Sequence, residues 1–171
     1  MELAEVRRLL WSVAADRAAA ALVATNDTVV EVSVAPGGRW VARSHNLEWI
    51  GNPAGVECWR IHPAGGAREI RHDRAAGWVH PTVGLLWPEL LPLWGRPSDT
   101  HRPARVIDGS SGPGQILFGP VDGLPEPPTT LDLDPTRWLC LRLEMPGREW
   151  TLRDYQVSGG SQACNFPPAP S

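Results

Sequence analysis

The stretch from residue 78 to residue 96, WVHPTVGLLWPELLPLWGR, constrains the fold of this chain more than any other part of it. It holds three of the nine tryptophans and five leucines, and Glu89 is the only charged residue before Arg96. We call it the tryptophan-rich segment. A segment this apolar is an aggregation liability unless it is buried. Strand-like patterns precede and follow it, so we expect it to lie across a sheet.

The tryptophan-rich segment also carries signals for a short helix. Pro88 suits the first helical position, where its missing N–H group needs no partner. Glu89 in the first turn agrees with the helix dipole. Pro92 limits such a helix to about two turns, and Gly95 is a suitable end. We therefore expect residues 83–94 to form a short internal helical lid.

The remainder of the chain is dominated by short runs of β-branched, aromatic and alternating residues between turn signals. The run TVVEVSV, the turn Pro36-Gly37-Gly38 and the run GRWVARS together predict a hairpin. The last three runs form a second meander. The predicted strands are residues 28–34, 38–44, 46–50, 56–62, 68–72, 104–107, 115–118, 129–133, 138–144 and 149–157.

An N-terminal helix is predicted over residues 2–23. Residues 18–21 are four alanines, the best helix former, and they continue the pattern. Asn26 and Asp27 then end it. The residues at helical spacing on one face are Leu3, Val6, Leu10, Val13 and Arg17.

These elements predict an α+β fold in which a curved antiparallel β-sheet, a half-barrel, is covered by the N-terminal helix and the internal lid. A single domain is expected over residues 1–157, because the chain of 171 residues is long enough to bury a core. Residues 158–171 are rich in Gly, Ser and Pro without apolar periodicity, and we expect a flexible tail.

Charge and hydropathy exclude several classes of partner. The formal net charge is −3, which argues against nucleic-acid binding. All sixteen basic residues are arginine, as is common in proteins from GC-rich genomes. No apolar run approaches the roughly 18 residues of a membrane span. The first residues show no signal-peptide pattern, so a cytoplasmic location is expected. The oligomeric state is left open.

The three cysteines form neither a disulfide framework nor a zinc motif, since their number is odd and no CxxC is present. Cys58 and Cys140 fall in predicted strands, so we expect buried free thiols. The five histidines form no HExxH or HxH pattern, and therefore neither a metal nor another cofactor is expected.

The closing block TTLDLDPTRWLCLRLEMPGREWTLRDYQV resembles the end of the outer-membrane lipoprotein carrier family, the LolA-like proteins. The matching pieces are a strand ending in Asp (residues 131–134), a tight turn (135–136), a strand (138–143) and an acidic-aromatic run (151–155). The order of helix, sheet and internal helical segment is also similar. The resemblance implies an unclosed half-barrel whose apolar concave face is covered by helices and binds acyl chains.

The leading functional hypothesis is the binding of a hydrophobic small molecule or acyl chain in an apolar, tryptophan-lined cavity, without covalent chemistry. Apolar pockets favour rigid aromatic walls with few polar groups. The candidate ligand-binding residues are Trp40, Trp59, Trp78, Leu86, Trp87, Leu90, Trp94 and Trp138.

Two alternatives remain open. A biosynthetic enzyme, a cyclase or isomerase, would use the same cavity with His72, Asp73, His80 or Glu89 as general acid or base. A protein–protein interaction module would use exposed tryptophans as anchors.

Overall fold

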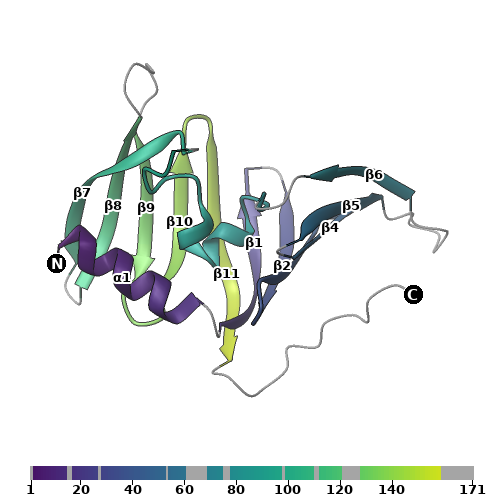
Figure 1. The fold of residues 1–171 in the computed structure, drawn as a ribbon, viewed down its shortest axis with the longest axis horizontal. Coiled ribbons are helices and arrows are strands. Elements are labelled where there is room, and N and C mark those ends of the chain that lie inside the picture. Colours follow the sequence, from purple (N-terminus) through teal and green to yellow (C-terminus); the bar gives the residue numbers. More distant parts are fainter. Residues whose placement is uncertain are drawn as a thin grey trace.

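The computed structural model describes residues 2–14, 17–26, 28–52, 54–60, 69–74, 78–97, 99–109, 112–120 and 128–158. In this part of the chain, eleven strands form one antiparallel sheet, accompanied by one α-helix and two short 3₁₀ helices (Figure 1). The strands are β1 (Ala18–Thr25), β2 (Val29–Ala35), β3 (Arg39–Arg43), β4 (Leu47–Asn52), β5 (Gly55–Arg60), β6 (Glu69–Arg74), β7 (His101–Gly109), β8 (Gly112–Pro120), β9 (Thr129–Asp134), β10 (Leu139–Met145) and β11 (Arg148–Ser158).

The strand order is β6-β5-β4-β3-β2-β1-β11-β10-β9-β8-β7. Two meanders, β1 to β6 and β7 to β11, therefore meet at the centre of the sheet, where β1 pairs with β11. The tryptophan-rich segment lies between β6 and β7 in the chain, so it is the covalent link from one meander to the other.

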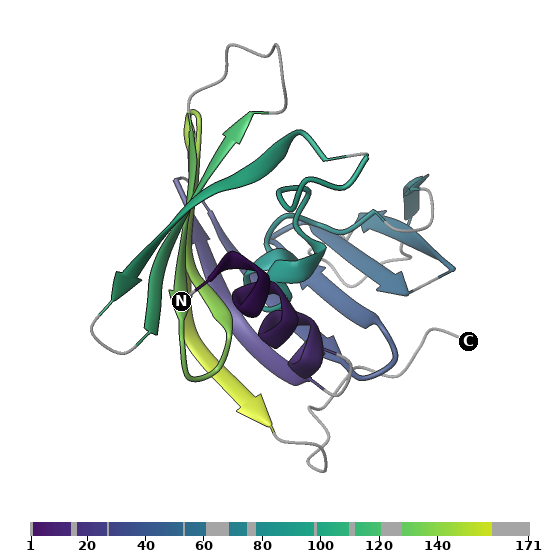
Figure 2. The ribbon, with the colours of Figure 1, turned by 60° about the vertical axis from the view of Figure 1, so that its left-hand side comes forward.

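The sheet is open, with β6 and β7 as its edges, and it curves around the helix α1 (Leu3–Ala14) and the 3₁₀ helices (Figure 2). The predicted curved antiparallel sheet with an N-terminal helix is confirmed. The α+β class overstated the helical content, since α1 has 12 residues and the described chain is mostly strand.

The predicted helix over residues 2–23 is confirmed for Leu3–Ala14 and wrong from Ala18 onward, because residues 18–25 form β1. This strand is hydrogen-bonded to β2 on one side and β11 on the other. Ala19, Ala21 and Val23 are buried on its inner face. Two strand ladders and this burial outweigh the intrinsic helix propensity of alanine.

The tryptophan-rich segment forms two 3₁₀ helices, η1 (Val83–Leu85) and η2 (Pro88–Leu90), and not a two-turn helix. Pro88 occupies the first turn as predicted. Leu91 has φ −58° and ψ 143°, an extended conformation that ends η2. The following Pro92 explains it, because a residue before proline is disfavoured in the α region.

The 3₁₀ helices are packed as part of the core. η1 contacts β2, β3 and β10, and η2 contacts α1. The side chains of Val83, Leu85, Leu86 and Leu93 are fully buried. The segment thus lies across the sheet, as its composition predicted.

The remaining predicted strands are found with small shifts of their ends, except around residues 97–103. Residues 101–103 precede the predicted strand 104–107, but they belong to β7 because its ladder with β8 begins at His101. Residues 61, 62 and 68 of two predicted strands, and 159–171 of the predicted tail, lie outside the described residues.

The buried free thiols are confirmed for Cys58 and Cys140, while Cys164 is outside the described chain. Among the described residues, no group of three or more His, Cys, Asp or Glu side chains is placed to hold a metal ion. No helix in this part of the chain has both the length and the apolar character that a membrane crossing requires.

Candidate functional site

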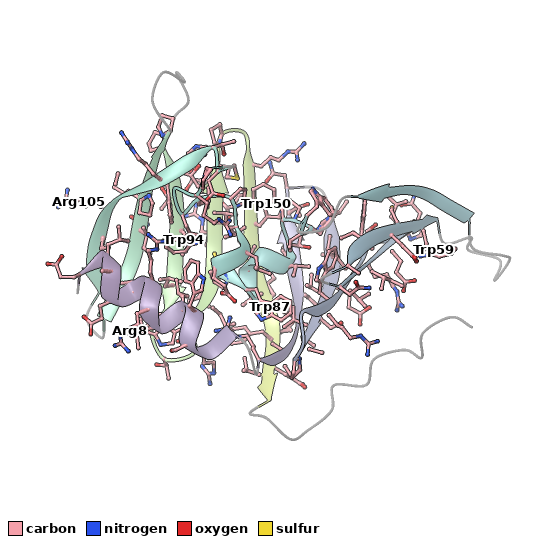
Figure 3. The ribbon with its side chains drawn as sticks, viewed as in Figure 1. Arg8, Trp59, Trp87, Trp94, Arg105 and Trp150 are labelled. Carbon is pink, nitrogen blue, oxygen red and sulfur yellow. The ribbon has the colours of Figure 1, made fainter. Side chains whose placement is uncertain are left out.

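A groove of about 680 Å³ opens between the tryptophan-rich segment and the hairpin formed by β10 and β11. We call it the hairpin groove. Trp78, Val79 and Leu90 form its apolar wall on the side of the segment. Met145 and Trp150 form the opposite wall. Trp150 lies near the start of β11, close to the hairpin turn (Figure 3).

The wall residue Trp78 belongs to an aromatic cluster. Its ring centroid lies 5.2 Å from that of Trp49, 6.2 Å from Trp40 and 6.0 Å from His80. Trp40 covers Gly51 on the neighbouring strand, where a Cβ atom would come within 2.0 Å of the indole. These contacts hold Trp78 against the sheet, so the groove has a rigid aromatic wall on this side.

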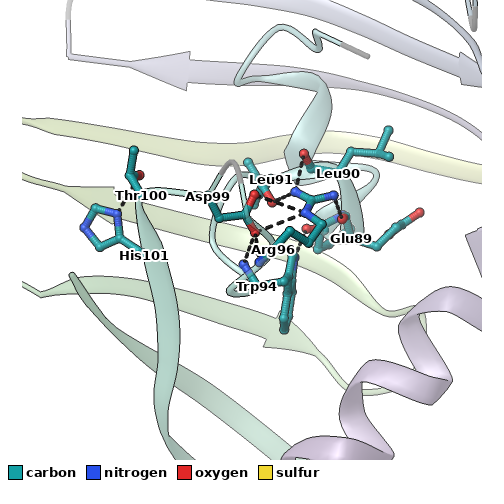
Figure 4. A network of polar contacts seen from close by, with 9 residues as sticks. Glu89, Leu90, Leu91, Trp94, Arg96, Asp99, Thr100 and His101 are labelled. Carbon is teal, nitrogen blue, oxygen red and sulfur yellow. Dashed lines mark hydrogen bonds and ion pairs between the residues drawn. The ribbon is translucent and has the colours of Figure 1, made fainter. Parts of the chain in front are cut away.

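Arg96 and Asp99 clamp the end of the tryptophan-rich segment (Figure 4). The Asp99 carboxylate accepts hydrogen bonds from the backbone N–H of Trp94 at 2.8 Å and from the Arg96 Nε at 3.0 Å. The Arg96 guanidinium donates to the carbonyl oxygens of Glu89 at 3.3 Å and Leu91 at 2.6 Å. These bonds satisfy carbonyls that η2 leaves unpaired, so the clamp fixes one side of the groove.

Of the eight candidate ligand-binding residues, Trp78 and Leu90 line the hairpin groove. Five others are buried in the core: Trp40, Leu86, Trp87, Trp94 and Trp138. Trp59 lies on β5, far from Trp87 and Trp94 (Figure 3), and its indole N–H donates to Glu57 at 3.0 Å. An apolar residue looks the same in sequence whether it fills a core or faces a groove.

Trp94 illustrates the packing role of the buried tryptophans. Its indole N–H donates to the carbonyl oxygen of Pro88 at 2.7 Å. Its ring makes edge-to-face contacts with Trp11 at 5.5 Å and with Phe118 at 5.4 Å. It therefore joins η2, α1 and β8 in one core.

The four candidate catalytic residues do not form one constellation. His72 and Asp73 lie on the edge strand β6, with their backbones opposite Cys58 and Glu57. The structure describes the backbone of these two residues but not their side chains. His80 precedes η1, and its Nδ1 lies 2.7 Å from the hydroxyl of Thr82. Burial lowers the pKa of His80 to about 4, which keeps the ring neutral.

Glu89 lies on η2, which packs against α1, and is 5 % exposed. Its Oε2 has no hydrogen-bond partner among the described residues. Burial raises the pKa of this carboxyl to about 7, against the lowering effects of its own backbone N–H and of Arg17. His80 and Glu89 thus sit in different surroundings, and neither is among the residues that wall the groove.

Arg17 is a buried cation that the sequence pattern assigned to a helix face. Its guanidinium donates to the carbonyl oxygen of Leu86 and, at 3.4 Å, to that of Arg137. Burial lowers its pKa, while the nearby Glu89 raises it. Arg17 thereby connects the tryptophan-rich segment to the turn between β9 and β10.

Sequence reasoning missed the half of the groove that comes from the β10–β11 hairpin. Met145, Pro146, Arg148 and Trp150 line it. Trp150 falls within the strand predicted over residues 149–157, and Met145 and Pro146 lie between that strand and the one predicted over 138–144. No spacing rule relates these positions to residues 78–96, because only the folded sheet brings them together.

The residues on which the family resemblance rests meet at one end of the sheet. Asp134 accepts hydrogen bonds from the backbone N–H groups of Thr136 at 2.8 Å and Arg137 at 3.0 Å, and from the Tyr155 hydroxyl at 3.3 Å. Burial alone would raise the Asp134 pKa, but these amide donors and the Arg137 side chain lower it. Trp138 takes a left-handed φ of 56° as the turn closes. This arrangement locks the β9–β10 turn to β11.

No protein-family model matches the chain, and a comparison with curated protein sequences finds no significant match. The site is therefore interpreted from its own geometry.

Proposed function

We propose that the protein binds a hydrophobic small molecule or an acyl chain in the hairpin groove. The observation that carries this proposal is an open groove of about 680 Å³ with Trp78, Leu90, Met145 and Trp150 as its apolar walls. Its volume falls in the range of about 300–1,000 Å³ typical of small-molecule sites. Rigid indole walls supply contact area at a low cost in conformational entropy.

The polar groups of the groove favour binding over catalysis. Arg96 and Asp99 are occupied by the clamp on the tryptophan-rich segment. Of the candidate acid–base residues, His80 is half-buried behind the wall residue Trp78, and Glu89 is buried at the contact with α1; neither lines the groove. An open, curved antiparallel sheet also agrees with what the resemblance to the lipoprotein carrier family implies, and the two buried free cysteines fit a reducing, cytoplasmic setting.

Titration with a fluorescent fatty-acid analogue tests the proposal. We expect saturable binding with one site per chain, and quenching of tryptophan emission. Met145→Ala should weaken binding by about 1 kcal/mol, roughly fivefold, because it removes part of an apolar wall. Leu141→Ala is the matched control, since Leu141 is also a half-buried residue of β10 but does not line the groove.

Equal binding by the parent and a folded Met145→Ala variant would place the ligand elsewhere. Absence of binding to the parent would refute the proposed function. Loss of binding in Leu141→Ala to the same extent would show that stability, and not the groove wall, controls the signal.

A further inference from the structure

A second, polar hollow of about 300 Å³ lies next to the hairpin groove. Arg148 and Trp150 line both of them, so these two residues mark the junction. Thr25, Asn26 and Thr28 of the β1–β2 turn line the polar hollow. An apolar groove beside a polar hollow matches the two parts of an amphiphile.

Arg148 is the cation available at this junction. Its side chain is exposed and has no hydrogen bond or ion pair among the described residues, while its backbone pairs with Met145 in the β10–β11 ladder. The other arginine of the groove, Arg96, is already committed to Asp99 and to backbone carbonyls. A ligand in the groove therefore meets one uncommitted guanidinium.

The acidic residues near Arg148 are paired with a different arginine. Glu149, which lines the polar hollow, accepts a hydrogen bond from Arg142 at 2.7 Å and one from the Thr151 hydroxyl at 3.2 Å. Glu144 lies 3.1 Å from the same guanidinium. Asp99 is neutralised by Arg96. Arg142 and Arg148 therefore balance the two glutamates in formal charge, and both of these carboxylates lie on Arg142, which leaves the Arg148 guanidinium for a ligand.

Resting on the proposed function, we infer that the ligand is an acyl chain with an anionic head group, a carboxylate or a phosphate, whose oxygens bind Arg148. The chain lies between Trp78 and Met145, and the head group lies at the entrance of the polar hollow. A guanidinium presents paired N–H donors that match the oxygens of either head group.

Three ligands with the same alkyl chain test the inference: dodecanoate, dodecyl phosphate and dodecanol, each used to displace an uncharged fluorescent alkyl probe at pH 8. We expect the parent protein to bind the better of the two anions about fivefold more tightly than dodecanol at low salt, and less so at high salt. The tighter anion identifies the head group as a free fatty acid or a phosphate.

Variants of the junction then assign the preference to Arg148. Arg148→Gln should bind all three ligands with the affinity of dodecanol, and Arg148→Lys should keep part of the preference. Arg153→Gln is the matched control, because Arg153 is also exposed on β11 but lines neither hollow.

The possible failures are separable. Equal binding of dodecanol and both anions by the parent would overturn the inference and leave the proposed function intact. A preference that survives in Arg148→Gln would also overturn it. Binding of none of the three by the parent would overturn the proposed function itself.

Discussion

The carboxyl of Glu89 is buried at the contact between η2 and α1, and its pKa of about 7 couples protonation to folding. Between its ordinary value of 4.5 and about 7, the folded state binds this proton more tightly than the unfolded state does. Raising the pH through this window therefore lowers the free energy of unfolding. The lowering is complete above about pH 7, where both states are ionised.

Replacing Glu89 by Gln should remove this loss of stability at higher pH, because the amide has the same shape and no charge. We expect Glu89→Gln and the parent to have similar melting temperatures at pH 4.5. At pH 8 the variant should be more stable, by on the order of 3 kcal/mol at most. Thermal unfolding between pH 4.5 and 8 measures the difference, with Glu5→Gln as an exposed control. A gap that does not change with pH would contradict a buried, ionising Glu89.

Because His80 also titrates, the stability of the parent must be compared with that of Glu89→Gln at each pH. The folded pKa of His80, about 4, lies below the ordinary 6.5, so falling pH lowers stability between these values. This trend opposes that of Glu89 over much of the same window. The stability of the parent alone would therefore change little with pH. Subtracting its curve from that of Glu89→Gln isolates the contribution of the Glu89 carboxyl.

At the scale of elements, β1 shows where sequence patterns succeed and fail. The run TVVEVSV alternates β-branched and polar residues, and β2 is found where it was predicted. In β1 the inward residues Ala19 and Ala21 and the outward Ala20 are identical in type, so no alternation is visible. A uniform alanine run reports helix propensity alone, and the strand is imposed by its two neighbours.

Ala24→Thr tests the strand assignment of β1. Ala24 is half-buried and lies opposite Val29 and Thr151 on the neighbouring strands. A β-branched residue there should raise the free energy of unfolding by about 0.2–1 kcal/mol through cross-strand packing. Ala4→Thr in α1 is the contrasting control and should lower it by about 0.5 kcal/mol. Chemical denaturation of the parent and both variants measures these free energies of unfolding. A lower stability for Ala24→Thr than for the parent would support a helix at this position.

The structure of the tryptophan-rich segment could be predicted only in part from the sequence. Its burial and its position across the sheet follow from its composition. Its geometry depends on Pro92, which forces Leu91 into an extended conformation and shortens the helix. Which of its apolar side chains face a groove could not be predicted, because Met145 and Trp150 come from a hairpin about fifty residues later and only the folded sheet brings them near.

At the scale of the molecule, the β1–β11 ladder makes the two meanders depend on one another. Val23 and Leu152 are opposite each other on this ladder, and both are buried. Neither meander presents a complete core without the other, because η1 packs on strands of both. We therefore expect one cooperative unfolding transition for residues 1–157, the single domain predicted from the sequence.

Leu152→Ala should lower the stability of both meanders together, by about 2–4 kcal/mol. Native-state hydrogen exchange measures it, comparing amides of β3 in the first meander with amides of β9 in the second. Leu22→Ala is the control, since Leu22 is exposed on the other face of β1. A loss of protection confined to β9 would show that the meanders unfold as separate units.

Because β1 pairs with β11, the central ladder of the sheet cannot form until the end of protein synthesis. The ribosome releases β1 roughly 120 residues before β11, so one side of β1 has no partner during most of translation. The unpaired N–H and C=O groups of β1 form a template on which another nascent chain can pair. The same holds for β10 after it is made and before β11 follows. We therefore expect the growing polypeptide to be most prone to such pairing until its last strand emerges and fills the gap at the centre of the sheet.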